Sequence, residues 1–403
     1  MTSTRRTSSL TMAVFAMQAM SFGAWLALIP FVKEDLGLSK GELALALLGF
    51  PVALIPTMKL ASGIVTRVGP RKALMGAFPM LALVVTLPLF STGPVTLFLC
   101  LAVLGLVIAF LEIGMNVYAG RLEKERKVTV MSRCHGFWAV GIMIGSGLMT
   151  LLAWAPPLAG LLSISVASAA CGVIAARSLP HLGAPPGTPP PPRRSLRQAP
   201  VALVPIALCT LAVTMTEGAM SDWAAVYLAE RLPPGATHAG IAVSIFAGFL
   251  AAGRFAGDAL KTRFGAVLLA RGAILLAVTG LMCLVLPLPV VTAYVGFALL
   301  GTGCAVAFPL GVSAAAALDD TYEGENIALT SMVAVTGFLI GPPMIGGLAE
   351  LQGLRLGLAA LLPFLLAGFV LAPRLEPVPV SDSAGDSGRP HPVSGRREGR
   401  TWG

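Results

Sequence analysis

The sequence lacks the charged surface and the reactive motifs of a soluble enzyme. Only 12% of its 403 residues are charged, whereas soluble domains carry about 25%. It contains no GxxxxGK[ST] phosphate-binding loop, so ATP hydrolysis by this chain alone is not expected, and it contains neither HExxH nor GxSxG. Three of its four histidines (His181, His238 and His391) fall in expected loops or in the tail. We therefore expect no enzymatic activity and no catalytic residues.

Cysteine is scarce and never paired along the chain. The six cysteines have no CxxC or metal-ligand spacing, and each lies in an apolar segment: Cys100, Cys134, Cys171, Cys209, Cys283 and Cys304. Cysteines of this kind are more often small buried hydrophobes than disulfide or metal partners. The sequence therefore predicts no metal site and no cofactor.

Long apolar runs are what the sequence has in abundance. Hydrophobic residues make up 56% of the chain, and its mean hydropathy is +0.84. Runs such as 73–90 and 266–286 approach the ~20 residues that a helix needs to cross the hydrocarbon layer. The run that follows Arg5 and Arg6 extends to Phe31. This is too long for the core of a signal peptide, so we interpret it as a retained first helix.

Twelve membrane spans follow from these runs and from the turn signals between them. The predicted spans are 9–31, 43–65, 73–91, 95–118, 134–154, 157–178, 201–229, 237–260, 266–286, 289–314, 327–349 and 354–373. Residues 1–178 would form an N-terminal six-helix bundle, and residues 201–374 a C-terminal one. The Pro- and Arg-rich segment 179–200 is typical of a solvated cytoplasmic linker, and the composition of 375–403 favours a disordered tail. The predicted fold is an all-α integral membrane protein.

The positions of Lys and Arg predict the orientation in the membrane. If the N-terminus is cytoplasmic, most of the 28 basic residues fall in cytoplasmic segments, and the opposite side keeps Lys33, Lys40, Arg231 and Arg355. This asymmetry is the one that the positive-inside rule describes. The net charge of +9 is therefore a topology signal, and we expect no nucleic-acid partner. We predict a multi-pass protein of the cytoplasmic (inner) membrane with both termini in the cytoplasm.

Weak internal repeats indicate that the two halves are related. The string TRVG at 66–69 follows the second span, and TRFG at 262–265 follows the eighth, 196 residues later. Trp25 in the first span has a counterpart in Trp223 of the seventh. The fifth and eleventh spans each carry spaced glycines: Gly136, Gly141, Gly145, Gly337, Gly341 and Gly346. Six plus six helices related by parallel duplication is how one class of transporter builds a site at the membrane midplane.

Thr66, Arg67, Gly69 and Arg71 lie in the short loop after the second span. Their pattern resembles the signature of the major facilitator superfamily, with Thr66 at the position where that family has an acid. The C-terminal copy runs from Asp258 to Gly265, again with a threonine, Thr262, in the acidic position. We expect that Asp258 and Arg263 replace the usual acidic latch.

Four longer strings are more specific: LEIGMNVYAGRLE at 111–123, MSRCHGFWAVG at 131–141, EGAMSDWAAVYL at 217–228 and AAGRFAGD at 251–258. They are similar to the MosC-like branch of this superfamily, which is loosely related to fucose-permease-like sugar carriers. The resemblance spans about 10–373 and implies a secondary transporter that works by alternating access. It also implies that the fifth and eleventh helices line the seam between the two domains, and that Gly141, Gly145, Gly337, Gly341 and Pro342 form a sliding surface there.

Charged residues inside the predicted spans are the candidate site residues, because a charge in lipid is costly unless it faces a cavity or a partner. Glu217 and Asp222 lie in the seventh span, which the resemblance places beside the cavity. A carboxylate there is suited to carry a proton or to bind a cationic group, although it could also be a structural acid. Trp25 and Trp223 could stack on a ring or a cation, or lie at the membrane interface. Arg254 could pair with an acid such as Glu217 or contact substrate.

A second polar set lies near the cytoplasmic ends of the second, fourth and fifth spans: Lys59, Glu112, Asn116, Arg133, His135 and Trp138. Glu112 and Asn116 are four residues apart and share a helix face. Lys59 opposite Glu112 would neutralise both charges, and His135 could open such a network on protonation. The alternative is a static polar clasp that holds the N-terminal bundle together.

The leading hypothesis is a proton-coupled transporter of a small polar, sugar-like metabolite across the cytoplasmic membrane. A proton-antiport efflux pump for amphipathic compounds is the alternative, and a transport-dead membrane sensor is less favoured. The expected partners are a small-molecule substrate, protons and the lipid bilayer. We expect the protein to be a monomer.

Overall fold

The computed structural model describes residues 2–182, 199–233, 238–319 and 322–376. Most of the predicted linker and almost all of the predicted tail lie outside these described residues. Within them, twelve helical segments are long and apolar enough to cross a membrane. The predicted count of twelve spans is therefore confirmed.

Six of these segments form the N-terminal bundle. Its elements are α1 (Thr2–Asp35), α2 (Lys40–Leu47), α3 (Gly49–Val68), α4 (Pro70–Val84), η1 (Leu87–Phe90), α5 (Pro94–Arg126), α6 (Met131–Leu151) and α7 (Pro157–Ser178). Helices α2 and α3 together make one span, as do α4 and η1.

The other six segments form the C-terminal bundle. Its elements are α8 (Leu203–Ala229), α9 (Ile241–Phe264), α10 (Ala266–Val285), α11 (Val291–Cys304), α12 (Ala307–Ala316), α13 (Glu323–Gln352), α14 (Leu354–Ala359), α15 (Leu362–Leu371) and η4 (Ala372–Leu375). Helices α11 and α12 share a span, and α14, α15 and η4 share another.

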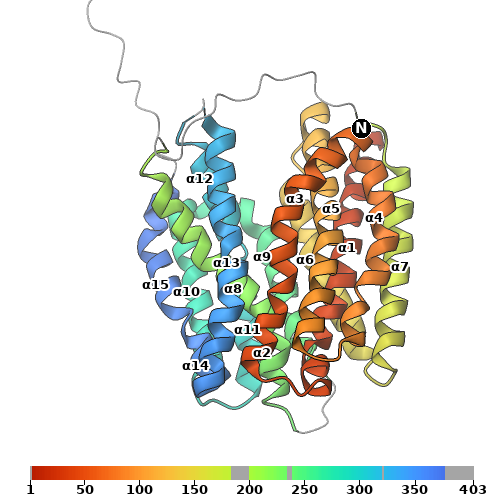
Figure 1. Cartoon of the computed structure of the whole chain (residues 1–403). Helices are drawn as coiled ribbons and strands as arrows, with labels where there is room; N and C mark the ends of the chain where they lie inside the picture. The colour runs from red at the N-terminus through yellow and green to blue at the C-terminus, as the bar shows by residue number, and fades with distance from the viewer. Residues whose placement is uncertain (1, 183–198, 234–237, 320–321, 377–403) are drawn as a thin grey trace, which may run out of the picture.

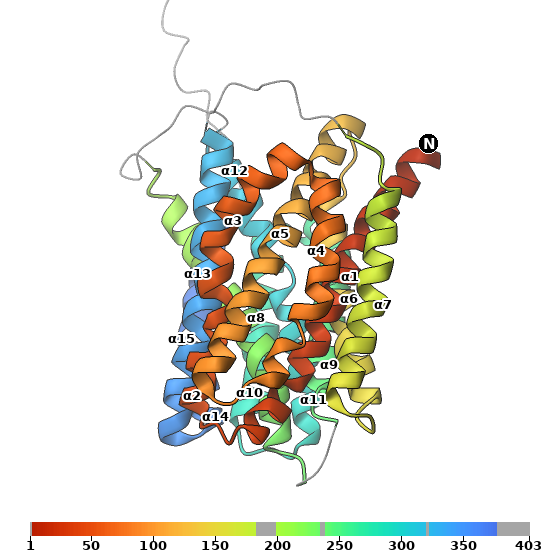
Figure 2. The same cartoon turned by 45° about the vertical axis from the view of Figure 1, so that its right-hand side comes forward.

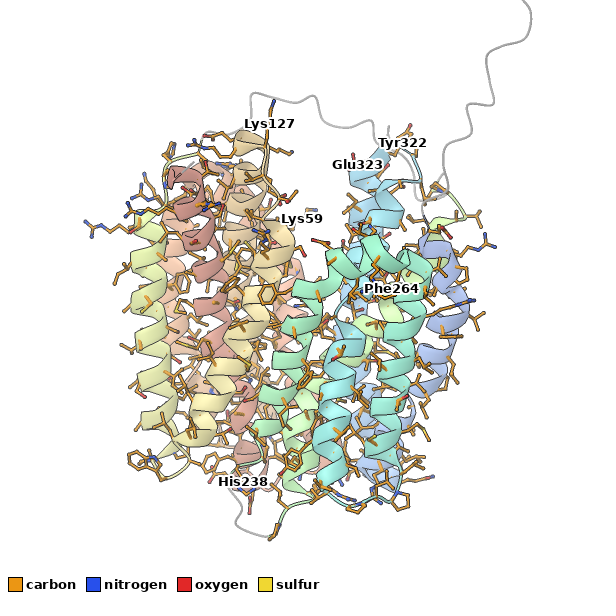
Figure 3. All side chains as sticks on the ribbon, turned by 180° about the vertical axis from the view of Figure 1, so that it is seen from behind. Lys59, Lys127, His238, Phe264, Tyr322 and Glu323 are labelled. Carbon is orange, nitrogen blue, oxygen red and sulfur yellow. The ribbon has the colours of Figure 1, made fainter. Side chains whose placement is uncertain are left out.

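The two bundles stand side by side with their helices roughly parallel to one common axis (Figures 1 and 2). Lys127 and Glu323 lie at one end of the molecule and His238 at the other (Figure 3). We refer to these as the Lys127 end and the His238 end. The predicted alternation of spans requires Lys127 and Glu323 to share one end of the molecule and His238 to lie at the other, and they do (Figure 3).

Proline explains the breaks within three spans. Each second helix begins shortly before a proline: Pro51 in α3, Pro309 in α12 and Pro363 in α15. Proline has no N–H to donate to the carbonyl four residues earlier, and its ring crowds that carbonyl. In the first of these spans Pro51 leaves the carbonyl of Leu47 without the N–H that would normally bond it in a helix. Leu47 also lines the cavity described below.

The helices extend further than the apolar runs predicted. The first helix begins at Thr2 instead of residue 9, and α5 runs on to Arg126 instead of residue 118. A helix can continue into water because its backbone hydrogen bonds are internal to the segment, so hydropathy marks the membrane boundary and not the helix end. Helix α5 ends where Lys127 adopts a left-handed conformation with φ of 51°.

The two TR-x-G strings form matching turns. Gly69 has φ of 91° between α3 and α4, and Gly265 has φ of 78° between α9 and α10. This left-handed region favours glycine because it has no Cβ. Before each turn a threonine hydroxyl donates to the carbonyl four residues earlier, from Thr66 to Ser62 at 2.7 Å and from Thr262 to Asp258 at 2.9 Å.

The acidic latch predicted for Asp258 and Arg263 is not formed. Both side chains are exposed, and the described residues contain no ion pair between them. The guanidinium of Arg263 lies over the ring of Phe264 instead, 5.2 Å from its centroid. In the N-terminal copy, Arg71 donates to the carbonyl of Arg177 at the end of α7. The threonine in the acidic position leaves these arginines without the expected carboxylate partner.

The glycines predicted to line the seam between domains lie inside the bundles. A Cβ on Gly141 or Gly145 would overlap the backbone of α1. A Cβ on Gly337 or Gly341 would overlap Met215 of α8 in the same way. The prediction was wrong because helix periodicity turns these residues toward their own bundle. The two pairs are 196 residues apart, the same offset as the TR-x-G turns, so they are structural counterparts.

Replacing Gly145 with alanine is expected to destabilise the N-terminal bundle. The added methyl group would overlap the carbonyl oxygen of Met20, and overpacking of this kind costs roughly 1–3 kcal/mol. The matched control is Gly76→Ala in α4, where a Cβ meets nothing within 4 Å. Thermal unfolding of the purified protein should show a lower Tm for Gly145→Ala only. Equal Tm values for the two variants would contradict this close contact.

Candidate functional site

A cavity of about 300 Å³ lies between the two bundles. Most of its lining is apolar and aromatic, and the rings of Phe22 and Phe50 stack at one wall with centroids 5.1 Å apart. Its polar lining comes from five helices: Gln18, Glu112, His135, Trp138, Thr214, Glu217, Ser221, Asp222 and Arg254. A cavity that receives side chains from both bundles is where a solute could contact both at once.

Glu217 and Arg254 form an ion pair at the cavity wall. Nη2 of Arg254 in α9 lies 2.8 Å from Oε1 and 3.1 Å from Oε2 of Glu217 in α8. Glu217 is 6% exposed. Each charge therefore neutralises the other in a setting where an unpaired charge would be costly. Of the two alternatives predicted for Arg254, the structure contains the pairing with Glu217.

Arg254 also connects the two bundles. Its Nη1 donates to the backbone carbonyl of His135 in α6 at 3.3 Å. One guanidinium thus holds a carboxylate of its own bundle and a carbonyl of the other. Any movement of α6 past α9 must break or replace this bond.

Asp222 lines the same cavity without such a partner. It lies five residues after Glu217 on α8 and is half-buried. Among the described residues it makes no ion pair and no hydrogen bond, and Arg254, the one Lys or Arg among the lining residues, is already taken by Glu217. The carboxylate is therefore available to a solute or to a proton.

Glu112 and Asn116 come together as predicted, but Lys59 does not join them. The amide of Asn116 donates to Oε2 of Glu112 at 3.3 Å and to its carbonyl at 2.9 Å. Thr57 and Ala61 belong to the buried face of α3, and Lys59 lies two residues from each. Two residues correspond to about 200° around a helix. Lys59 is consequently exposed on the opposite face, and the predicted Lys59–Glu112 pair is wrong.

Of the remaining members of the predicted clasp, Arg133 lies apart, whereas His135 and Trp138 line the same cavity as Glu112. Arg133 is exposed, with no hydrogen bond or ion pair among the described residues. His135 and Trp138 line the cavity, and Trp138 Nε1 donates to Oε1 of Gln18 at 2.8 Å. Gln18 is 1% exposed in α1. Sequence reasoning missed it, although an amide in a run of apolar residues is itself a signal of a buried hydrogen bond.

The two predicted tryptophans occupy different environments. Trp25 in α1 is 2% exposed and lines the cavity. Trp223 is fully buried and is not among the lining residues. It packs against α13, where a Cβ added to Gly346 would lie 3.0 Å from Cζ2 of the Trp223 ring. Both residues are buried, but of the two only Trp25 contributes to the cavity lining in this conformation.

Contacts between the bundles close the His238 end. Lys40 in α2 pairs with Glu230 after α8 at 3.2 Å. The backbone N–H of Gly41 donates to Oε2 of Glu350 in α13 at 3.0 Å. Ser146 in α6 and Ser244 in α9 share a hydrogen bond of 2.8 Å. None of these residues was predicted as a contact between the bundles, because residues of these types are common at span ends and in apolar runs.

At the Lys127 end the two bundles diverge. Helices α3 and α13 separate toward this end (Figure 1). The cavity therefore lies between the Lys127 end, where the bundles stand apart, and the His238 end, where they are sealed. The described residues contain no group of three or more His, Cys, Asp or Glu side chains that could hold a metal ion.

Comparison with known sequences identifies a matching family and related membrane proteins. The model of the Major Facilitator Superfamily matches residues 10–320. An uncharacterized MFS-type transporter of Yersinia pestis is 28% identical over 87% of this chain and 92% of its own length. Membrane protein MosC of Rhizobium meliloti is 26% identical over 89% of this chain and 86% of its own length.

Solved structures share the fold at low identity. The crystal structure of the nucleoside transporter NupG superposes with a TM-score of 0.66 at 15% identity, covering 92% of this chain and 98% of that one. A bacterial homolog of the human lysosomal transporter Spinster, inward-facing and unoccupied, gives 0.67 at 12% identity, covering 92% and 97%. At such identities the likeness concerns the fold alone.

Removing one partner of the Glu217–Arg254 pair is expected to cost more stability than removing both. Glu217→Gln or Arg254→Gln leaves one charge buried without its counter-charge, a loss of roughly 3–5 kcal/mol. The double variant should lose less than the sum of the two single variants, as thermal unfolding would measure.

The more exposed Lys40–Glu230 pair serves as the matched control for this double-mutant cycle. Its side chains are 24% and 36% exposed, and such pairs contribute roughly 0.2–1 kcal/mol. Additive effects at Glu217 and Arg254 would mean that the two charges do not depend on each other.

Proposed function

Because this chain belongs to the Major Facilitator Superfamily, we propose that it is a secondary transporter for a small amphipathic solute that carries a positive charge. The solute would occupy the cavity between the bundles, and the carboxylate of Asp222 would be its counter-charge. The observation that carries this proposal is the position of Asp222: it lines a largely apolar cavity and has no cationic partner among the described residues.

The surroundings of Asp222 support a solute of mixed character. The aromatic wall of Phe22 and Phe50 suits an apolar body, and Trp25 can contact a cation with its ring face. Glu112, also without a basic partner among the described residues, adds a second carboxylate from the opposite bundle. A charge in such a setting is stable when a counter-charge or a proton is bound, so a cationic solute and a proton would compete for the same carboxylates.

Competition of this kind would couple transport to protons. We assign the exchangeable proton to Asp222 in preference to Glu217, because Arg254 already holds the carboxylate of Glu217 at 2.8 Å. Binding of the solute at Asp222 would displace the proton, and release of the solute would restore it. Coupling by this route links the two flows in opposite directions, as an antiporter requires.

A neutral polar, sugar-like solute is the second candidate. Gln18, Ser221 and Asp222 supply hydrogen-bonding groups to the cavity that Trp25 also lines. This candidate is weaker because most of the remaining lining is apolar, whereas a polar solute would need partners on every side.

We also propose that the protein lies in the plasma membrane and that its Lys127 end faces the cytoplasm. The excess of Lys and Arg at this end supports that orientation. The sealed contacts at the His238 end would then face outward, and the conformation described above would be inward-facing.

Amphipathic amines are expected to stabilise the protein through Asp222. Phenethylamine should raise the Tm of the wild type in a concentration-dependent way, because a ligand that binds the folded state stabilises it by mass action. The shift should disappear in Asp222→Asn. The neutral isostere of phenethylamine, 2-phenylethanol, should give the same small Tm shift in the wild type and in Asp222→Asn. The control variant Asp35→Asn, which changes an exposed acid at the end of α1, should behave as the wild type.

Proteoliposomes test the coupling itself. A proton gradient should drive phenethyltrimethylammonium, a permanently charged analogue that does not cross a bilayer by itself, against its concentration gradient in the wild type and not in Asp222→Asn. A thermal shift by glucose or inositol, with none by the amine, would instead favour the second candidate. Full gradient-driven accumulation by Asp222→Asn would refute the assignment of the proton to this residue.

Thiol labelling in cells is expected to report the orientation. In a cysteine-free chain, a membrane-impermeant maleimide should label His238→Cys in intact cells, and Lys127→Cys only after permeabilisation. The reverse pattern would place the Lys127 end outside.

A further inference from the structure

The two seams between the bundles differ in how they are closed. On one side α6 packs along α9. The rings of Phe137 and Phe255 meet edge to face, with centroids 5.5 Å apart. Further toward the His238 end, a Cβ on Gly248 would lie 2.8 Å from Sδ of Met143, and the Ser146–Ser244 bond follows. This seam is therefore in contact over about three turns of both helices.

On the other side the bundles meet only near the His238 end in the described residues. There a Cβ on Gly346 of α13 would overlap Ala44 of α2, and Gly41 bonds Glu350. Beyond this point α3 and α13 diverge (Figure 1). Both helices contribute lining residues to the central cavity along the diverging stretch: Pro51, Leu54, Ile55, Met58, Val335, Phe338 and Pro342. We call the space between these two edges the α3–α13 slot.

The edges of the slot are apolar and continue into the apolar outer surface. None of its lining residues carries a charge. On the outward faces of the same helices Leu60 is 68% exposed and Ile340 is 49% exposed. The protein spans a bilayer, so the medium that meets such a surface is hydrocarbon. An apolar slot offers water few hydrogen-bond partners, whereas an acyl chain can pack against both of its edges.

Lys59 adds a charge at the mouth of this slot. It follows Ile55 by four residues on α3 and therefore shares its helix face, one turn nearer the Lys127 end. It is exposed and makes no ion pair or hydrogen bond with a described residue, and Figure 3 shows it on the side of the molecule toward Lys127. Lysine side chains at such positions extend toward the lipid head groups. An ammonium above an apolar slot is complementary to a phosphate above an acyl chain.

We propose that the α3–α13 slot binds a phospholipid from the leaflet at the Lys127 end. One acyl chain enters between α3 and α13 and reaches the apolar lining of the central cavity, and Lys59 holds the phosphate. The occupied slot seals the cavity against lateral leakage while the bundles stand apart at this end. This lipid site does not depend on the solute assigned to Asp222, so either can fail without the other.

Native mass spectrometry of the full chain tests the head-group contact, with phosphatidylglycerol as the probe. Lys59→Gln should weaken binding of the first lipid about fivefold, because one Lys near an anionic surface contributes about 1 kcal/mol. Lys59→Arg should retain it. Lys124→Gln removes one charge from the exposed end of α5 and should leave the first binding step unchanged. Equal losses for Lys59→Gln and Lys124→Gln, or no loss for either, would overturn the proposed contact.

Spin labelling in vesicles tests the acyl chain. In a cysteine-free chain, a nitroxide at Ile55→Cys or Phe338→Cys should collide often with lipid-soluble oxygen and rarely with a water-soluble nickel chelate. A nitroxide at Met143→Cys, on the α6–α9 seam, should meet neither. Greater access to nickel than to oxygen at Ile55 and Phe338 would mean a water-filled slot, and no access to either would mean a closed one; both results would refute the proposal.

A third measurement needs no substitution in the cavity. A phospholipid with a photoreactive group on its acyl chain should cross-link wild-type protein within 51–58 and 334–342, and not within 137–147 of α6. Cross-links confined to the outward faces of α3 and α13 would refute entry of the chain into the slot.

Discussion

A charge surrounded by hydrocarbon must have a partner or a route to water, and the arrangement of this protein follows from that constraint. Within the spans, Arg254 and Glu217 satisfy each other at 2.8 Å. Glu112 and Asp222 instead face an internal cavity, and Lys59 lies at an exposed edge. Moving Glu112 or Asp222 into contact with acyl chains would cost several kcal/mol. The cavity between the bundles is therefore where polar chemistry can occur, and the rest of the membrane-embedded surface is left to apolar packing.

Arg254 gives this constraint a mechanical consequence, because it is shared between an intra-bundle ion pair and a carbonyl of the opposite bundle. The α6–α9 seam that it crosses is held by specific contacts, whereas the α3–α13 seam is closed, among the described residues, only near the His238 end. Rocking of one bundle on the other would strain the first seam and open or close the second. The polar contacts at Lys40, Gly41 and Glu350 are exchangeable with water at their end of the molecule, which suits contacts that must break and re-form.

Much of the fold could be predicted because its causes are local. Hydrophobic runs of membrane length indicated twelve spans, and the repeated strings TRVG and TRFG, 196 residues apart, indicated the duplication. The breaks at Pro51, Pro309 and Pro363 have an equally local cause. The glycine prediction failed for a different reason. Gly141 and Gly145 were expected at the seam between domains, but a small residue says only that something comes close, and the helix phase that turns them toward α1 is set by packing across the bundle.

The candidate site divides in the same way. From the sequence alone came the identity of the groups that need an explanation: Glu217, Asp222, Arg254, Glu112 and Lys59 stand out because ionisable residues in apolar helices are costly. Their pairing was decided by the tertiary structure. Arg254 reaches Glu217 because α8 and α9 pack together, and Lys59 misses Glu112 because it lies about 200° around α3 from the face that packs inward. Spacing along one helix predicts which residues share a face, but distances between helices depend on rotation and tilt, which only the assembled bundles determine.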